Sequence, residues 1–216
     1  MSIFKFLVNH NKQGSFVNQF RQKRFDYLKN RIEKLIQKDT FKILDIGGDI
    51  QYWKNIGWQH PACKIHLLNL YTSEIPQSDT NQFTSSIGDG LALSYQKGDV
   101  DLIFSNSVIE HVGSYENQQI FANEVMRVSD KYIIQTPSLW FPLEPHSLLP
   151  LFQFLPHPIR ALLIMTFNIN YFPKAKTYKE AIIVSHSTLM FTHKRFKELF
   201  PDAEIQVERF LGIPKS

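Results

Sequence analysis

The segment 41–53, FKILDIGGDIQYW, constrains the fold of this chain more than any other. Its apolar run ends at Asp45 and is followed by the glycine pair Gly47 and Gly48. This pattern predicts a buried strand that ends in a tight turn and leads into a helix. In parallel sheets such a turn lets a ligand approach the backbone at the carboxyl end of a strand. The segment therefore predicts a small-molecule site at the edge of an α/β sheet.

Apolar runs of strand length alternate with helical stretches along most of the chain. The predicted strands are 42–46, 64–70, the strand-to-turn segment 85–93, 102–105, 131–137 and 204–210. The predicted helices are 118–128 and 194–200, and 52–57 is predicted as a helix or a turn. Strands separated by helices are typical of parallel sheets with helices on both faces. We therefore expect a single α/β domain over 1–216, with a doubly wound, mostly parallel, Rossmann-like sheet. A chain of 216 residues is long enough for one such domain.

The N-terminal part, 1–40, is expected to add a helical segment. The stretch 21–38 is rich in lysine and arginine, and its apolar residues recur at helical spacing. A basic amphipathic helix most often closes one end of a domain, although it also fits a membrane surface or a nucleic acid. Because no nucleic-acid-reading module follows it, we expect no nucleic-acid partner.

The segment 141–187 predicts a helical cap inserted after the fifth strand. Its longest uninterrupted apolar piece, 161–172, is shorter than the roughly 20 residues that a membrane-spanning helix needs. The N-terminal sequence has too short an apolar run for a signal peptide. The single cysteine, Cys63, excludes an internal disulfide and fits a reducing compartment. We therefore expect a cytoplasmic protein, with peripheral membrane contact as the alternative.

The order of these motifs resembles the class I S-adenosylmethionine-dependent methyltransferases over roughly residues 41–137. The following tail, from TPSLWFPLEPHSLLPLFQFLP to the closing FPDAEIQVERFLGIPKS, is similar to a bacterial, type 11-like branch of this family. The resemblance implies a seven-stranded sheet and S-adenosylmethionine as the cofactor. It also implies an enzyme that moves a methyl group by in-line displacement to a small-molecule, glycan or lipid-like acceptor.

The glycine turn is the first segment that the resemblance assigns to the cofactor. Asp45, Gly47 and Gly48 match the family's first motif, in which the turn and the next helix N-terminus receive the cofactor's carboxylate. The acid takes up the cofactor's ammonium. Asp49 and Gln51 stand where the family usually has further glycines, and we expect them to make the turn less open.

Other strand ends supply the remaining cofactor positions. Asn69 stands where the family has an acid for the ribose hydroxyls, and an amide accepts one such bond and donates another. The resemblance assigns Asp89, Gly90 and Leu91 to the adenine, and Ser105 and Asn106 to the surroundings of the sulfonium.

Two glutamate–histidine pairs are the candidates for work on the acceptor. Glu110 and His111 follow the fourth predicted strand, and Glu144 and His146 lie in the predicted cap. Histidine has a suitable pKa for taking a proton from an acceptor, so His111 is the first candidate for the base and His146 the second. The favoured alternative for the second pair is that it holds the cap in place. All four side chains are of types that bind zinc, but their spacing gives no support for a metal site and we expect none.

Two other functions fit parts of the pattern. A non-catalytic binding or scaffold protein with a degraded cofactor turn is favoured by the departures at the turn and at Asn69. Asp45, Asp89 and the well-matched segment 101–112 favour an enzyme. A dinucleotide or nucleotide-sugar enzyme on a similar sheet is the third interpretation, and the missing third glycine and missing ribose acid count against it. The aromatic residues of the cap either form its own core, which is the more common case, or cradle an apolar acceptor.

Overall fold

Five parallel strands form the central sheet, in the order β3-β2-β1-β4-β5. The strands are β1 (Phe41–Ile46), β2 (Cys63–Asn69), β3 (Phe83–Ile87), β4 (Leu102–Asn106) and β5 (Tyr132–Gln135). The computed structural model describes residues 16–172, 174–210 and 212–216. Because the order reverses between β1 and β4, this is a doubly wound sheet, and its switch point is where such sheets bind ligands. The predicted parallel, doubly wound architecture is confirmed.

The register of the strands brings their carboxyl ends to one edge of the sheet. Asp45 of β1 lies beside Leu67 of β2 and Phe104 of β4. Asn69, the last residue of β2, lies beside Ile87 of β3. Side chains at and just after these strand ends therefore share a common edge, although they are far apart in sequence.

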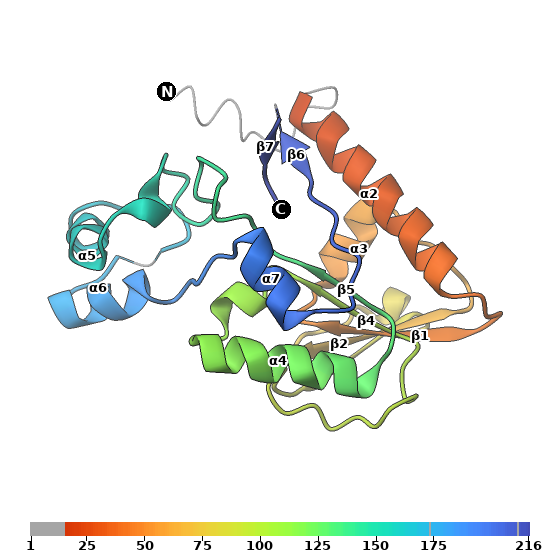
Figure 1. Cartoon of the computed structure of the whole chain (residues 1–216). Helices are drawn as coiled ribbons and strands as arrows, with labels where there is room; N and C mark the ends of the chain where they lie inside the picture. The colour runs from red at the N-terminus through yellow and green to blue at the C-terminus, as the bar shows by residue number, and fades with distance from the viewer. Residues whose placement is uncertain (1–15, 173, 211) are drawn as a thin grey trace.

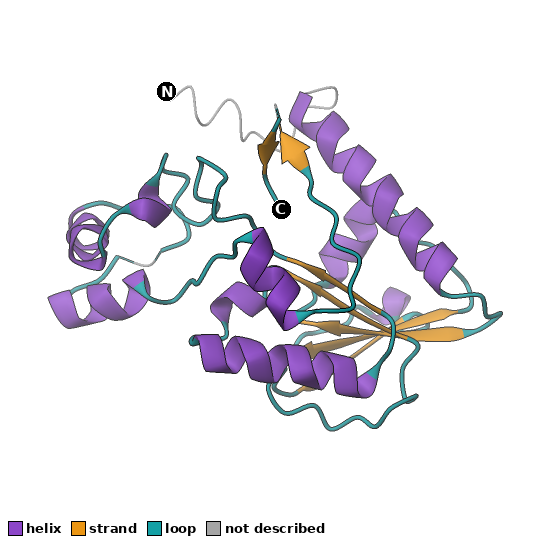
Figure 2. Cartoon of the chain, in the orientation of Figure 1, coloured by secondary structure: helices purple, strands orange, loops and turns teal. Residues whose placement is uncertain are grey.

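Helices cover both faces of the sheet, which explains why its strands are apolar on both sides (Figure 2). The helices α2 (Phe16–Leu35) and α3 (Ile50–Ile56) share one apolar cluster with alternate strand residues such as Ile43. The helices α4 (Tyr115–Val128) and α7 (His193–Leu199) share a second cluster with the intervening residues, such as Leu44. The sheet is thus the middle layer of a three-layer sandwich.

Most predicted elements are present with shifted ends. The basic helix predicted at 21–38 is α2, which ends at Leu35. The helix predicted at 118–128 is α4, which begins at Tyr115 because the Ser114 hydroxyl accepts a hydrogen bond from the N–H of Asn117 and caps the first turn. The third strand ends at Ile87, so most of the predicted segment 85–93 forms the turn that follows it.

The number of strands is a correction to the sequence analysis. In the described part of the chain the main sheet has five strands, not seven, and the predicted strand 204–210 is mostly irregular. Only β6 (Arg209–Phe210) and β7 (Ile213–Pro214) pair with each other, as a separate antiparallel ribbon. Figure 1 shows this ribbon near the start of α2, away from the sheet.

Ion pairs connect this C-terminal segment to α2. Arg24 contacts the Glu208 carboxylate at 2.7 Å, and Arg31 contacts Glu204 at 2.7 Å. The segment thus contacts the helix at two points, and β5 is the outer strand of the described sheet.

Residues 141–187, which we call the cap, fold beside the sheet around a core of their own. The cap contains η3 (Phe152–Phe154), α5 (His157–Thr166) and α6 (Tyr178–Ser185). Its apolar cluster is separate from the two clusters of the sheet and includes Phe152, Ala161, Ile164, Ile169 and Ala181. Figure 1 shows α5 and α6 side by side, outside the helices that cover the sheet. Among the described helices, none combines the length and apolar character needed to span a membrane.

Candidate active site

The glycine turn after β1 requires glycine at its first position. Gly47 has a φ of +74°, a left-handed conformation that favours glycine. A Cβ atom there would lie 2.3 Å from Cγ2 of Val108. The N–H of Gly47 donates to the carbonyl of Leu68 at 2.8 Å, which ties the turn to β2. The turn is therefore fixed between the ends of two neighbouring strands and the loop after β4.

Asp45 lies buried under this turn. The indole N–H of Trp53 donates to its Oδ2 at 2.6 Å, and a Cβ atom at Gly48 would lie 2.0 Å from the same oxygen. Burial raises the pKa of Asp45 to about 8, although the Trp53 hydrogen bond opposes this and the nearby Asp49 charge adds to it. The carboxyl therefore anchors α3 and the turn, and its contact with a cofactor ammonium stays a prediction.

Asp49 occupies the N-terminus of α3. Its side chain accepts a hydrogen bond from the N–H of Gln51 at 2.9 Å and caps the helix. The family resemblance implies that this helix N-terminus receives the cofactor's carboxylate. The Asp49 carboxylate thus already occupies this helix N-terminus, which is the physical reason to expect a less open turn.

Asn69 is half-buried at the end of β2 and bridges the turn. Its Nδ2 donates to the carbonyl of Gly48 at 3.0 Å and to the hydroxyl of Ser73 at 3.1 Å. The Oδ1 atom makes no hydrogen bond with the described residues. An oxygen held in this way can accept a hydrogen bond from a ribose hydroxyl.

The turn after β3 carries the residues predicted to meet the adenine. The exposed Asp89 accepts a hydrogen bond from the N–H of Leu91 at 2.9 Å, which forms a closed turn. A Cβ atom at Gly90 would lie 2.9 Å from the ring of Phe121, so this glycine permits close packing against α4. The N–H of Leu91 is thus already bonded within the turn.

Two apolar residues at the same edge were missed by the sequence analysis. Leu70 is 62% exposed and Ile87 is 65% exposed, directly after β2 and at the end of β3. Large apolar side chains left in solvent at a strand end are what a flat aromatic ligand can cover. The signal in the sequence was their position directly beside Asn69 and Gly88.

The end of β4 holds an unpaired acceptor. Ser105 is buried, and its hydroxyl donates to the carbonyl of Ile46 at 3.0 Å, which joins β4 to β1. The next residue, Asn106, has a buried Oδ1 atom without a hydrogen-bond partner in the described structure. Since buried acceptors are nearly always paired, this oxygen fits a donor on a bound ligand.

Glu110, His111 and His146 come together beyond the end of β4, although 35 residues separate the two histidines in the sequence. The rings of His111 and His146 have centroids 4.7 Å apart and lie nearly perpendicular. Ligand atoms of all three residues lie within 4.8 Å of one another. Burial lowers the pKa of His111, and the neighbouring His146 adds to this effect.

Glu110 is fully buried and lies close to the two histidines. Its Oε2 accepts a hydrogen bond from the hydroxyl of Thr136 at 3.0 Å, whereas Oε1 has no partner in the described structure. Burial raises the pKa of Glu110 to about 7, against the lowering effect of its hydrogen bonds.

Glu144 orients His146 from inside the cap. Its Oε1 lies 2.6 Å from Nδ1 of His146, and both carboxylate oxygens also accept backbone N–H groups, from His146 and Ser147. Burial alone would raise the pKa of Glu144, but these hydrogen bonds lower it. The pair therefore both shapes the cap and fixes the His146 ring.

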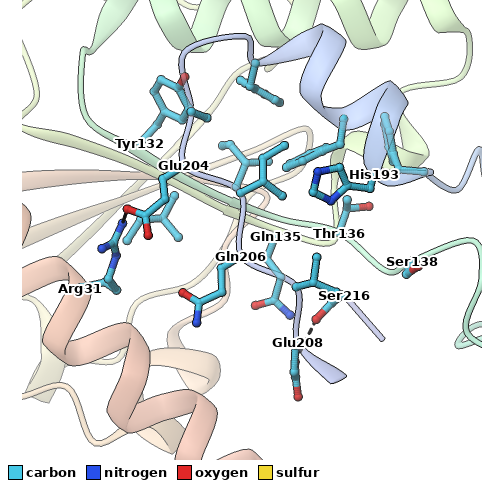
Figure 3. Close-up of a pocket in the computed structure, with 18 of the residues that line it drawn as sticks. Arg31, Tyr132, Gln135, Thr136, Ser138, His193, Glu204, Gln206, Glu208 and Ser216 are labelled. Carbon is cyan, nitrogen blue, oxygen red and sulfur yellow. Dashed lines mark hydrogen bonds and ion pairs between the residues drawn. The ribbon is translucent and has the colours of Figure 1, made fainter. Parts of the chain in front are cut away.

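A cavity of about 1120 Å³ lies elsewhere, between α2, β5 and the C-terminal segment. Figure 3 shows Arg31 paired with Glu204, and Gln206 and Glu208 on the segment that forms its wall. None of the predicted cofactor or catalytic residues lines it. The cavity reaches the carboxyl end of β5 through Gln135 and Thr136, while the predicted site residues lie outside its lining.

Comparisons with known proteins find similarity in structure only. No protein-family model matches the sequence, and no curated protein matches it. A possible exported protein from Bordetella parapertussis has a similar structure, with a TM-score of 0.50 at 11% identity, covering 89% of this chain and 67% of that one. At this identity the similarity concerns the fold alone.

Solved methyltransferases are also similar, at lower scores. One is an S-adenosylmethionine-dependent methyltransferase from Methanosarcina mazei, with a TM-score of 0.47 at 14% identity, covering 82% of this chain and 85% of that one. Another is phosphoethanolamine N-methyltransferase 2 from Haemonchus contortus, in complex with S-adenosyl-L-methionine, with a TM-score of 0.45 at 12% identity and 91% of this chain covered. The aligned region spans 39% of the Haemonchus protein, and 45% and 46% of two further methyltransferases.

Proposed function

We propose that this chain is a class I S-adenosylmethionine-dependent methyltransferase. The observation that carries the proposal is the unpaired oxygen of Asn106 at the switch point of a doubly wound sheet. It lies on the strand next to the glycine turn, and the free Oδ1 of Asn69 lies on the other side of that turn. Open α/β sheets bind their ligands at this place. Two acceptors at one sheet edge fit a ligand that carries several N–H and O–H donors.

Each residue at this edge binds a different part of the cofactor. Gly47 and Gly48 keep side chains out of the turn, and the Oδ1 atom of Asn69 accepts a hydrogen bond from a ribose hydroxyl. Leu70 and Ile87 flank the adenine. The predicted set Asp45, Asp89, Gly90, Leu91, Ser105 and Asn106 completes the pocket. When bound, S-adenosylmethionine supplies a methyl group that its sulfonium has already activated.

The histidines act on the acceptor. The Nδ1 atom of His146 is engaged by Glu144 at 2.6 Å, which leaves Nε2 to face a ligand. His111 lies across from it, so the two rings position the acceptor and assist the loss of its proton. Orientation of the reacting atoms alone can contribute about 7–11 kcal/mol in favourable cases.

The surface of the cap supports an apolar or lipid-like acceptor. Large apolar side chains in the cap or directly before it remain exposed: Trp140, Leu151, Phe154, Ile159, Leu162, Phe167, Tyr171, Tyr178 and Ile183. The exposed Lys174, Lys176 and Lys179 lie in the same region. Exposed apolar and basic side chains together fit the interface of an anionic membrane. We therefore place the acceptor among lipid-like molecules and expect peripheral membrane contact.

A titration tests the cofactor. Calorimetry with S-adenosylmethionine and with S-adenosylhomocysteine should give micromolar binding, and NAD should not bind. Asn69→Ala and Asn106→Ala should each weaken binding at least tenfold. Asn81→Ala, which changes an exposed asparagine at the opposite end of β3, is the matched control and should bind like the wild type.

A non-catalytic binding protein is the second candidate, favoured by the carboxylate of Asp49 on the N-terminus of α3. No binding of either ligand at millimolar concentration would exclude the methyltransferase and leave this candidate. Binding without transfer to any offered acceptor would instead support a sensor.

A further inference from the structure

We propose that Glu110, His111 and His146 bind one divalent transition-metal ion, for which zinc is the best match. The site lies between the loop after β4 and the cap. Nothing in the spacing of these residues along the sequence indicates it, because the fold alone brings His146 to the other two.

The distances fit a site that closes on an ion. Zinc holds nitrogen and oxygen ligands at about 2.0–2.2 Å, which places ligand atoms roughly 3–3.5 Å apart in a tetrahedral site. In the described structure the three ligand atoms already lie within 4.8 Å of one another. To reach this geometry the ligand atoms must approach one another by at most about 1.8 Å.

Glu110 supplies a separate reason for a cation. It is fully buried, and its Oε1 atom has no hydrogen-bond partner in the described structure. A buried carboxylate oxygen without a partner is costly to the fold. A cation beside it would remove this cost, and the two imidazoles complete its coordination.

The hydrogen-bond acceptors next to the two histidines are of the kind found in metal sites. A histidine that binds a metal usually donates its other ring N–H to a carboxylate or a carbonyl. The Nδ1 atom of His146 lies 2.6 Å from the Glu144 carboxylate, and Nδ1 of His111 lies 3.4 Å from the carbonyl oxygen of Ser187. Each ring thus keeps Nε2 for the ion.

The donor set selects the class of ion. Two imidazoles and one carboxylate suit zinc, manganese, iron or nickel, whereas magnesium and calcium prefer oxygen ligands only. Three protein ligands leave a position open for an oxygen atom of a ligand. Where the proposed function holds, and only there, this position receives the acceptor, and the ion lowers the pKa of its hydroxyl. His111 and His146 would then act as ligands of the ion and not as the base, and the hydroxyl proton would pass to solvent water.

Metal titration of the full chain tests the site. Protein stripped with a chelator should bind one Zn²⁺ per chain, measured by calorimetry and by elemental analysis after dialysis. With Co²⁺ in place of Zn²⁺, a visible absorption band should appear and saturate at the same ratio. His111→Gln and His146→Gln should each lower the affinity at least 100-fold, and Glu144→Gln should lower it about 10- to 100-fold.

Two histidine variants serve as controls. His193→Gln changes an exposed histidine on α7 and should leave metal binding unchanged. His186→Gln disrupts the stacked pair of His157 and His186, whose ring centroids lie 3.5 Å apart in the cap. It should also leave binding unchanged, and loss of the ion in this variant would overturn the assignment. Circular dichroism of each variant establishes that the fold is intact.

The outcomes separate this inference from the proposed function. No retained ion at micromolar Zn²⁺, or equal binding by the ligand variants and the wild type, overturns the metal site whatever the cofactor titration gives. One ion per chain without S-adenosylmethionine binding supports the metal site and contradicts the proposed function.

Discussion

The indole N–H of Trp53 donates to the buried carboxyl of Asp45, with 2.6 Å between Nε1 and Oδ2. This contact connects α3 to the end of β1 beneath the glycine turn. Gly48 lies against the same carboxyl, where a side chain has no space. One polar contact thus fixes both the helix after the turn and the shape of the turn itself.

Replacing the donor should destabilise the fold. Trp53→Phe leaves a buried carboxyl oxygen without its hydrogen bond and removes part of a packed indole, so we expect a loss of about 2–4 kcal/mol in the free energy of unfolding. Trp58→Phe is the matched control, because Trp58 is buried in the same apolar cluster. Urea unfolding compares them, and an equal loss in both variants would contradict a role for the Asp45 contact.

Asp45 should make the stability of the protein depend on pH. Its folded-state pKa is raised from an ordinary 3.8 to about 8, chiefly by burial. Its contribution is therefore fully present below about pH 4 and is lost as the pH rises through about 8. Between pH 5 and pH 8 the free energy of unfolding should fall by on the order of 3 kcal/mol through this group.

Asp45→Asn should remove this component, so that the difference in stability between variant and wild type changes with pH. Unfolding in urea at several pH values measures it. Asp39 is an exposed aspartate, and the free energy of unfolding of Asp39→Asn should change with pH as that of the wild type does. Parallel curves for Asp45→Asn as well would refute the raised pKa.

Gly48→Ala should disrupt the turn through a clash. The new Cβ atom would lie 2.0 Å from Oδ2 of Asp45, so the carboxyl or the turn must move. Gly98→Ala is the control, since it meets no atom within 4 Å and carries only the strain of a φ of +95°. That strain costs about 1–2 kcal/mol, and thermal unfolding should show a larger loss for Gly48→Ala.

The C-terminal segment should depend on one ion pair more than on the other. The Arg24–Glu208 pair is mostly buried, with side-chain exposures of 23% and 25%, whereas Glu204 is 68% exposed in its pair with Arg31. We expect Glu208→Gln to increase hydrogen exchange in 204–210 and to cost about 1 kcal/mol or more. Glu204→Gln should cost less than about 0.5 kcal/mol, and a reversed ranking would show that exposure does not control these pairs.

Local sequence patterns were sufficient to predict the sheet but not its C-terminal edge. The segment 42–46 could be predicted because a strand buried on both faces is continuously apolar, and β1 is Phe41–Ile46. The segment 204–210 also alternates in the manner of a strand. In the structure this segment instead contacts Arg24 and Arg31, more than 170 residues away in the sequence, and no local pattern contains that information.

The candidate site shows the same division. Asn69 and Asn106 were selected through the family resemblance, and parallel register explains why residues at these strand ends share one edge. The burial of Asp45 under Trp53 could not, since it depends on the angle at which α3 leaves the turn. The contact between His111 and His146 depends on how the cap packs. It could not be predicted, because the loop that carries His146 has no periodic sequence pattern.

The separate apolar cluster of the cap has a consequence for how such a protein can change. Because Phe152, Ala161 and Ile164 pack among cap residues, a different insertion between β5 and α7 would leave the interior of the sheet filled. We expect chimaeras that exchange this insertion to keep a folded sheet. The sequence of the cap, which selects the acceptor, can then change between related proteins while the sequence of the sheet stays the same.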